Sequence, residues 1–80
     1  MEMITTSPTA LGQAIRRIRK AKHLTQEVAG KPFRIEQRTV STIEQGFPGT
    51  RIDTLFRMLA ALDLEMVIRT KERPHTRSEW

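Results

Sequence analysis

The sequence contains no cysteine, no long apolar run and no segment typical of a secretion signal. Without cysteine there is no disulfide and no thiolate metal site, which fits a reducing compartment. No apolar stretch approaches the roughly 20 residues that a membrane-spanning helix needs, and the first ten residues lack a signal-peptide pattern. Its 80 residues leave room for one small core. We therefore expect a single small domain in the cytoplasm, with no membrane partner.

The sequence also has little that could perform catalysis. Its two histidines, His23 and His75, are accompanied by no cysteine and no spaced pair of acids. Nothing resembles a nucleophile–base arrangement, a set of metal ligands or a glycine-rich phosphate loop. We expect no catalytic residue, no metal, no cofactor and no small-molecule substrate, and hence no enzyme.

Positive charge is present in excess and is unevenly distributed. The formal net charge is +5, and residues 1–34 hold seven Arg or Lys against Glu2 and Glu27. Residues 35–63 hold three basic residues against four acids, and residues 64–80 hold four against three. The excess of positive charge in residues 1–34 indicates an anionic partner, most simply nucleic acid. A solvated basic helix face would account for the charge equally well.

Apolar residues at helical spacing predict four helices. The first begins at Ser7-Pro8, because serine caps a helix and proline is tolerated at its first position, and it ends near His23. The second is capped by Thr25 and stopped by Gly30-Lys31-Pro32. We expect Val28 and Ala29 to face inward from it.

The third helix runs from residue 36 or 37 to 45, with Gly46 as its cap, and the fourth covers about 51–62. In the fourth, the predicted inward stripe is Ile52, Leu55, Phe56, Leu59 and Leu62. Met58 and Ala61 lie off that stripe, so we expect them to form a second apolar face for a partner.

Residues 64–71 change the period of the pattern. Leu64, Met66 and Ile68 alternate with other side chains, which is typical of a strand. One strand in a helical chain has unpaired backbone groups that invite another chain. We therefore predict a two-fold dimer in which this strand pairs with its copy. The expected interface residues are Leu64, Met66 and Ile68 of the strand, together with Met58 of the fourth helix.

The third helix has an outward polar face. Gln37, Arg38 and Thr42 lie on it, while Val40 and Ile43 point inward. The forked donors of Gln and Arg match adenine and guanine edges in a DNA major groove. The pattern predicts a helix-turn-helix DNA reader.

Three stretches carry a family resemblance: LGQAIRRIRKAKHLTQ, TVSTIEQG and IDTLFRMLAALDLEM. They resemble the xenobiotic-response-element (XRE) helix-turn-helix family, which includes the lambda and 434 repressors. The strand and a polar tail ending in Trp80 resemble the HipB type of antitoxin. Such antitoxins are dimeric repressors that restrain a HipA-type serine/threonine kinase toxin. Arg34 and Pro32 depart from the family pattern, in which a glycine occupies the turn.

The resemblance implies a fold and an organisation. The fold is mainly α: a four-helix, lambda-repressor-like helix-turn-helix domain, one C-terminal strand that pairs across a dimer, and a flexible tail. We expect a flexible N-terminus at 1–6, the DNA-binding domain at 7–63, the dimerisation strand at 64–71 and the tail at 72–80. The protein would act in the bacterial cytoplasm, in association with the nucleoid.

The resemblance also implies roles for single residues. Gln37, Arg38 and Thr42 match base-reading positions, and Arg19 with Glu44 matches a buried structural ion pair. Trp80 is the expected anchor on the toxin, with a loose terminal residue as the alternative. The expected contacts to DNA phosphates are Thr25, Gln26, Thr39, Ser41, Thr50 and Arg51. The family glutamine that Gln26 matches also braces the reading helix, and we expect the same of Gln26.

The expected function is that of an antitoxin that represses its own operon at a palindromic operator and binds the kinase. Two alternatives stay open. One is a stand-alone phage-type or metabolic repressor, and the other is a protein-interaction inhibitor with weak DNA binding.

Overall fold

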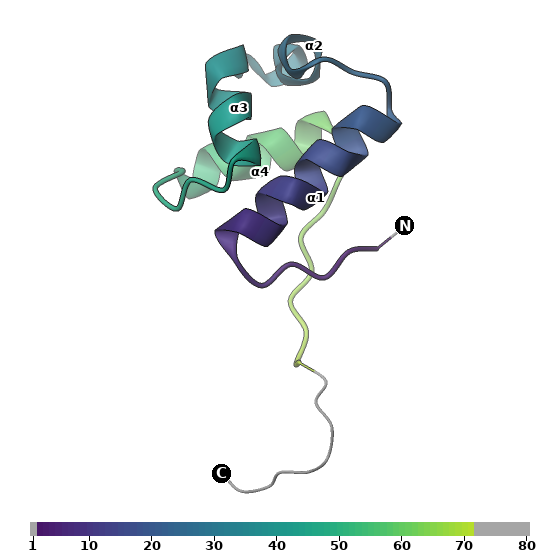
Figure 1. The fold of residues 1–80 in the computed structure, drawn as a ribbon, viewed down its shortest axis with the longest axis vertical. Coiled ribbons are helices and arrows are strands. Elements are labelled where there is room, and N and C mark those ends of the chain that lie inside the picture. Colours follow the sequence, from purple (N-terminus) through teal and green to yellow (C-terminus); the bar gives the residue numbers. More distant parts are fainter. Residues whose placement is uncertain (1, 72–80) are drawn as a thin grey trace, which may run out of the picture.

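The computed structural model describes residues 2–71, and within them four α-helices and one turn of 3-10 helix pack around a single core. The helices are α1 (Pro8–Ala21), α2 (Gln26–Gly30), α3 (Gln37–Glu44) and α4 (Ile52–Ala61), with the 3-10 turn η1 (Lys31–Phe33) after α2. α1 packs on α3, and α2 with η1 spans one end of the domain (Figure 1). The predicted four-helix architecture is confirmed.

Local sequence signals set the ends of the first two helices. The Ser7 hydroxyl accepts a hydrogen bond from the backbone N–H of Ala10 at 3.0 Å, and Pro8 occupies the first helical position. The Thr25 hydroxyl accepts from the N–H of Val28 at 3.1 Å. α2 is only five residues long, because Pro32 follows within η1 and cannot continue an α-helical hydrogen-bond ladder.

The turn before α3 has an unusual backbone. Arg34 adopts a left-handed conformation with φ of 56°, at the place where the family pattern has glycine. The N–H of Ile35 then donates to the carbonyl of Gly30 at 2.9 Å, which closes the turn. The Arg57 guanidinium of α4 donates to the carbonyl of Phe33 at 3.0 Å and ties η1 to α4. Together these bonds fix the direction in which α3 leaves the turn.

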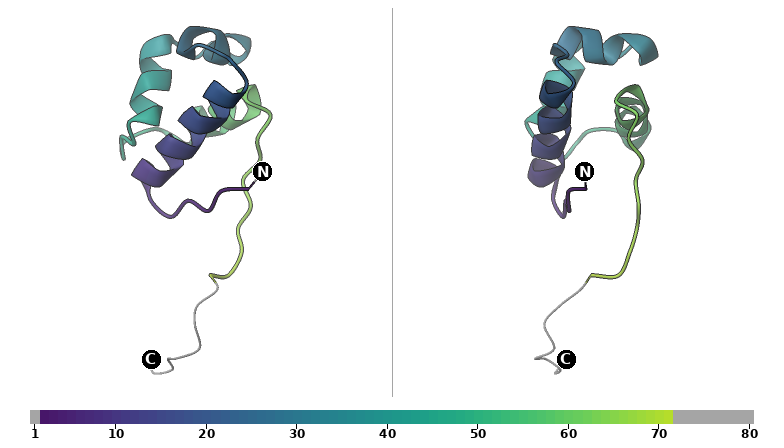
Figure 2. Two further views of the ribbon diagram at one scale, coloured as in Figure 1. Left: turned by 45° about the vertical axis from the view of Figure 1, so that its right-hand side comes forward. Right: turned by 90° about the vertical axis from the view of Figure 1, so that its right-hand side faces the viewer.

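The core lies where α1, α3 and α4 meet beneath α2 (Figure 2). It is built from aliphatic side chains of all four helices and of the turn before α3. Its buried members are Ile15, Ala29, Ile35, Val40, Ile43, Met58, Leu59 and Leu62.

The predicted inward stripe of α4 is right for Leu59 and Leu62, which are buried, and for Leu55, which packs against the core, but wrong for its other two residues. Met58 is fully buried (0% exposed), so it cannot form a dimer surface, whereas Ile52 and Phe56 are 68% and 48% exposed. Apolar residues surround this short helix on most sides, and the stripe that becomes buried depends on how α4 meets α2 and η1. Val28, expected to face inward from α2, is also exposed.

Residues 64–71 extend away from the helical body without regular secondary structure (Figure 1). Within residues 2–71 there is no β-strand, so the predicted strand is not confirmed in the single chain. Leu64 packs against the core, while Met66 and Ile68 are exposed, Ile68 to 92%. A strand requires a partner, and the pairing stays a prediction about the dimer.

No helix in the part of the chain that the structure describes is both long and apolar enough to cross a membrane. The predicted tail at 72–80, with Trp80 and His75, lies outside the described residues.

Candidate nucleic-acid interface

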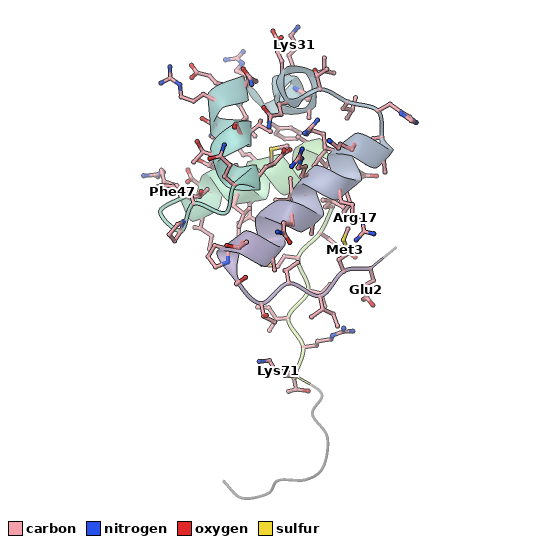
Figure 3. All side chains as sticks on the ribbon, viewed as in Figure 1. Glu2, Met3, Arg17, Lys31, Phe47 and Lys71 are labelled. Atoms are coloured by element: carbon pink, nitrogen blue, oxygen red, sulfur yellow. The ribbon has the colours of Figure 1, made fainter. Side chains whose placement is uncertain are left out.

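The outer side of α3 is polar, and side chains tipped with nitrogen or oxygen project from it and from α2 (Figure 3). Gln37 and Arg38 are exposed in the first turn of α3, and Val40 and Ile43 are buried on its opposite side. Glu36 at the N-cap makes no side-chain capping bond to the N–H groups of the first turn. This is the arrangement of a helix that can place side chains in a DNA groove.

Gln37 is held in place by α2. Its amide nitrogen donates to the Gln26 amide oxygen at 2.9 Å, and the Gln26 amide nitrogen donates to Glu44 Oε1 at 3.1 Å. The side chain at the front of α3 is thereby connected to the start of α2 and to the end of α3. Such bonding restricts the rotamers of Gln37 before any ligand arrives.

Arg19 and Glu44, the predicted ion pair, form a bidentate contact between α1 and α3. Arg19 Nε lies 2.6 Å from Glu44 Oε2, and Arg19 Nη2 lies 3.0 Å from Glu44 Oε1. Arg19 Nη1 also donates to the carbonyl of Leu24 at 2.8 Å. The hydrogen bonds to Glu44 raise the pKa of Arg19, although burial works in the opposite direction. Both side chains are buried, so the charges stabilise each other with little competition from water.

Thr42 lies one helical turn after Arg38 and is partly buried. Its hydroxyl donates to the carbonyl of Arg38 at 2.9 Å, which leaves the oxygen able to accept a bond from a ligand. Arg38 and Thr42 are four residues apart and share one side of α3, and Gln37 lies beside Arg38 toward α2. Base contacts by these three residues stay predictions.

Comparisons with known proteins agree with this geometry. No protein-family model matches the chain. It is 34% identical over 62 residues to the antitoxin HipB of Escherichia coli strain K12, a match that covers 78% of this chain and 70% of that protein. The chain belongs to the HipB antitoxin family. The HipB of a second E. coli strain, O6:H1, is also 34% identical, with 66% of its length covered.

Solved structures of HipB share the fold of this HipB-family chain. The HipB–O4 20mer complex aligns with a TM-score of 0.83 and 30% identity over 89% of this chain and all of that chain. The HipA–HipB–O2–O3 complex aligns with the same TM-score, identity and coverage. The helical arrangement, and not only the sequence, is therefore that of HipB.

The residues predicted to contact phosphate occupy three places in this HipB-family fold. Thr25 and Gln26 stand at the start of α2, where Thr25 already serves as the cap. Thr39 and Ser41 are partly buried within α3, and Ser41 Oγ accepts a bond from Gln45 at 3.1 Å. These four positions lie on the two helices of the helix-turn-helix, and their contacts with phosphate stay predictions.

Thr50 and Arg51 precede α4 and are already engaged within the protein. The Thr50 hydroxyl donates to the carbonyl of Phe47 at 3.0 Å, and Arg51 Nε lies 3.0 Å from Asp53 Oδ1. The hydrogen bond from Arg51 lowers the pKa of Asp53, which keeps that carboxylate charged beside the guanidinium. A phosphate contact by Arg51 would therefore have to compete with Asp53, an exposed acid that the sequence reasoning overlooked.

Two contacts of this HipB-family chain were not predicted in detail. Arg57 holds the turn through the carbonyl of Phe33. Gln26, which was expected to brace the third helix, bonds Glu44 at its end as well as Gln37 at its start. Helical spacing could place Arg57 on the exposed side of α4, but no pattern indicates that its partner is a backbone carbonyl 24 residues away in the sequence. Long-range bonds of this kind require the tertiary fold.

Among the described residues, no group of three or more His, Cys, Asp and Glu side chains could hold a metal ion.

Proposed function

We propose that this HipB-family chain is the antitoxin of a toxin–antitoxin module: a dimeric, sequence-specific DNA-binding repressor that also binds a HipA-type serine/threonine kinase. The observation that carries the proposal is the placement of Gln37 and Arg38. Both are exposed at the front of α3, and Gln37 is bonded to α2 before DNA is present. The similarity to solved HipB complexes, one of which contains HipA, supports both partners.

The mechanism divides the contacts by role. Arg38 would pair with a guanine and Gln37 with an adenine, because their paired polar atoms match the major-groove edges of those bases. Thr25 and Gln26 at the start of α2 would hold a phosphate and set the register of α3. A dimer would place two copies of α3 in successive major grooves about 34 Å apart, on a palindrome. Binding across the promoter of its own operon would block transcription.

The dimer would form through residues 64–71. Met66 and Ile68 expose apolar side chains on an extended segment, in which the N–H of Leu64 bonds the carbonyl of Leu59 and residues 65–71 make no backbone hydrogen bond within the described chain. Pairing this segment with its copy would satisfy those groups and cover the apolar side chains. The kinase would bind surfaces away from α3, with Trp80 as one anchor, since tryptophan is enriched at interface hot spots. The protein would act as a binding protein, not an enzyme, on nucleoid DNA in the bacterial cytoplasm.

Titration of the full chain with DNA from upstream of its own gene tests the proposal. At about 0.15 M salt, we expect binding to this DNA to exceed binding to a shuffled duplex by roughly 1,000-fold or more. The kinase encoded beside the gene, if present, should co-purify with the antitoxin and lose activity in the complex. Equal affinity for the shuffled duplex would contradict the repressor, and full kinase activity in its presence would contradict the antitoxin.

A further inference from the structure

Four side chains form a continuous series of hydrogen bonds from the interior of the domain to the DNA-facing surface. Arg19 binds Glu44, Glu44 accepts from Gln26, and Gln26 accepts from Gln37, with donor–acceptor distances between 2.6 and 3.1 Å. The series begins at a guanidinium in α1 that is almost completely buried and ends at an exposed amide in α3. We call these four residues the amide relay.

The direction of every bond in the amide relay follows from its buried end. The Glu44 carboxylate has a side-chain exposure of 3%, and both of its oxygens accept hydrogen bonds from the Arg19 guanidinium. A carboxylate paired with a guanidinium in this way offers only acceptors, so Gln26 must turn its NH₂ group toward it. That choice leaves the Gln26 oxygen facing Gln37, and Gln37 must then turn its own NH₂ group toward Gln26.

At the outer end, the amide relay determines what Gln37 offers to a ligand. The Gln37 nitrogen carries two hydrogens, of which one is used by Gln26. The second N–H and the carbonyl oxygen are bonded to no other residue of the described chain. Gln37 therefore presents one donor beside one acceptor, in a fixed order.

This order matches adenine and does not match guanine. In the major groove, adenine presents the N7 acceptor beside the N6 donor, whereas guanine presents two acceptors, N7 and O6. To offer two donors to guanine, Gln37 would have to give up its bond to Gln26. The carbonyl oxygen of a correctly bonded Gln37 would instead face the O6 of guanine, and two acceptors repel each other.

We propose that Glu44 is a positioning residue for base recognition, acting through Gln26 to fix the Gln37 amide and thereby to favour adenine over guanine at one operator position. The inference rests on the proposed function, because it requires α3 to lie in the major groove. It assigns to the buried ion pair a role in specificity in addition to its role in stability.

The experiment compares adenine and guanine at a single base pair. Selection from randomised duplexes with the full wild-type chain first defines the operator, and Gln37→Ala then identifies the base pair that Gln37 reads. Affinities for the adenine and guanine versions of that site are measured for two variants. Gln26→Met removes the middle of the amide relay, and the double variant Arg19→Met with Glu44→Met removes its buried end.

The double variant replaces the ion pair by apolar side chains of similar length, a change that is often neutral or stabilising, and thermal unfolding verifies its fold. Gln45→Met is the matched control, because Gln45 bonds only Ser41 and lies outside the amide relay. We expect the adenine-to-guanine affinity ratio to fall about three- to tenfold in both test variants, the size of one lost hydrogen bond, and to stay unchanged in the control.

The outcomes separate this inference from the proposed function. If either Gln26→Met or the double variant keeps the wild-type ratio, Glu44 does not act through Gln26 and the inference is overturned. If the double variant does not fold, the conservative variant Glu44→Gln decides instead, because its amide can donate as well as accept and no longer dictates the order of the Gln26 amide. The orientation of the Gln37 side-chain amide in this variant is measured by NMR in the DNA complex. An amide with wild-type order and rigidity would overturn the inference. Wild-type protein without any base preference would contradict the proposed function itself.

Discussion

Gly12 of α1 lies directly against the backbone of Ile43 in α3. A Cβ atom built on Gly12 would stand 2.5 Å from the Ile43 carbonyl oxygen and 2.6 Å from that of Glu44, closer than any real contact of this kind. α1 and α3 can therefore approach to this distance only where α1 carries no side chain. The contact also sets the separation across which Arg19 reaches Glu44.

Gly12→Ala should destabilise the domain. The added methyl group meets rigid backbone, which forces α1 and α3 apart and outweighs the gain of about 1 kcal/mol in helix propensity. We expect the free energy of unfolding, measured with urea, to fall by about 1–3 kcal/mol. The neighbouring Gln13→Ala, at an exposed position of the same helix, is the control and should change it by less than about 0.5 kcal/mol. Equal free energies of unfolding for Gly12→Ala and Gln13→Ala would refute the close contact between α1 and α3.

Arg34→Gly should have the opposite effect. Arg34 holds a left-handed backbone at φ of 56°, which costs energy in any residue with a Cβ atom and costs little in glycine. We expect the substitution to stabilise the domain by about 0.5–1 kcal/mol. As a matched control, Lys31→Gly removes a similar exposed cation from a right-handed position at φ of −57° and should destabilise instead. A loss of stability in Arg34→Gly would count against relief of strain in the turn.

The pair Arg51–Asp53 predicts a response to acid. The hydrogen bond from Arg51 lowers the pKa of Asp53 in the folded state below its unfolded value. Between these two pKa values, the folded protein therefore binds fewer protons than the unfolded chain. The contribution to stability is present above the unfolded pKa and is lost as the pH falls through the folded pKa. An NMR titration of the Asp53 carboxyl should give a depressed midpoint that rises toward the ordinary value in Arg51→Met. An unchanged midpoint in that variant would contradict the cause assigned here.

Sequence patterns predicted the helices well because the relevant signals are local. Caps at Ser7 and Thr25, and Gly46 with its positive φ of 82°, fix the ends of elements without reference to the rest of the chain. The burial of Met58 could not be predicted in this way, because it depends on which side of α4 meets α2 and η1. Only tertiary packing chooses between Met58 and Phe56.

Helical periodicity indicates which residues of α3 are exposed, and the resemblance anticipated the Arg19–Glu44 pair, but the bond from Gln26 to Glu44 could not be predicted. Gln37 and Arg38 face outward by helical periodicity, which a sequence reveals. The bond between Gln26 and Glu44 joins residues 18 apart, and its direction depends on a third residue, Arg19. Such coupling exists only once α1, α2 and α3 are assembled.

The dimer proposed through residues 64–71 can be tested by placing a charge on one side of the segment. Ile68→Asp should dissociate the dimer, because a carboxylate would be buried where an apolar side chain is expected to pack. Val67→Asp introduces the same charge at an exposed neighbour on the other side of the segment and should leave the dimer intact. Sedimentation equilibrium measures both. A dimeric Ile68→Asp variant would remove this segment from the interface.

Arg38 offers the most direct test of α3 as the DNA-reading helix. Binding of wild-type protein and Arg38→Ala is compared across a set of operators, each changed at one base pair. The account predicts that Arg38→Ala loses about 1–3 kcal/mol of binding free energy and its preference at one base pair, while preferences elsewhere persist. An Arg38→Ala profile identical to that of the wild-type protein at every base pair would contradict it.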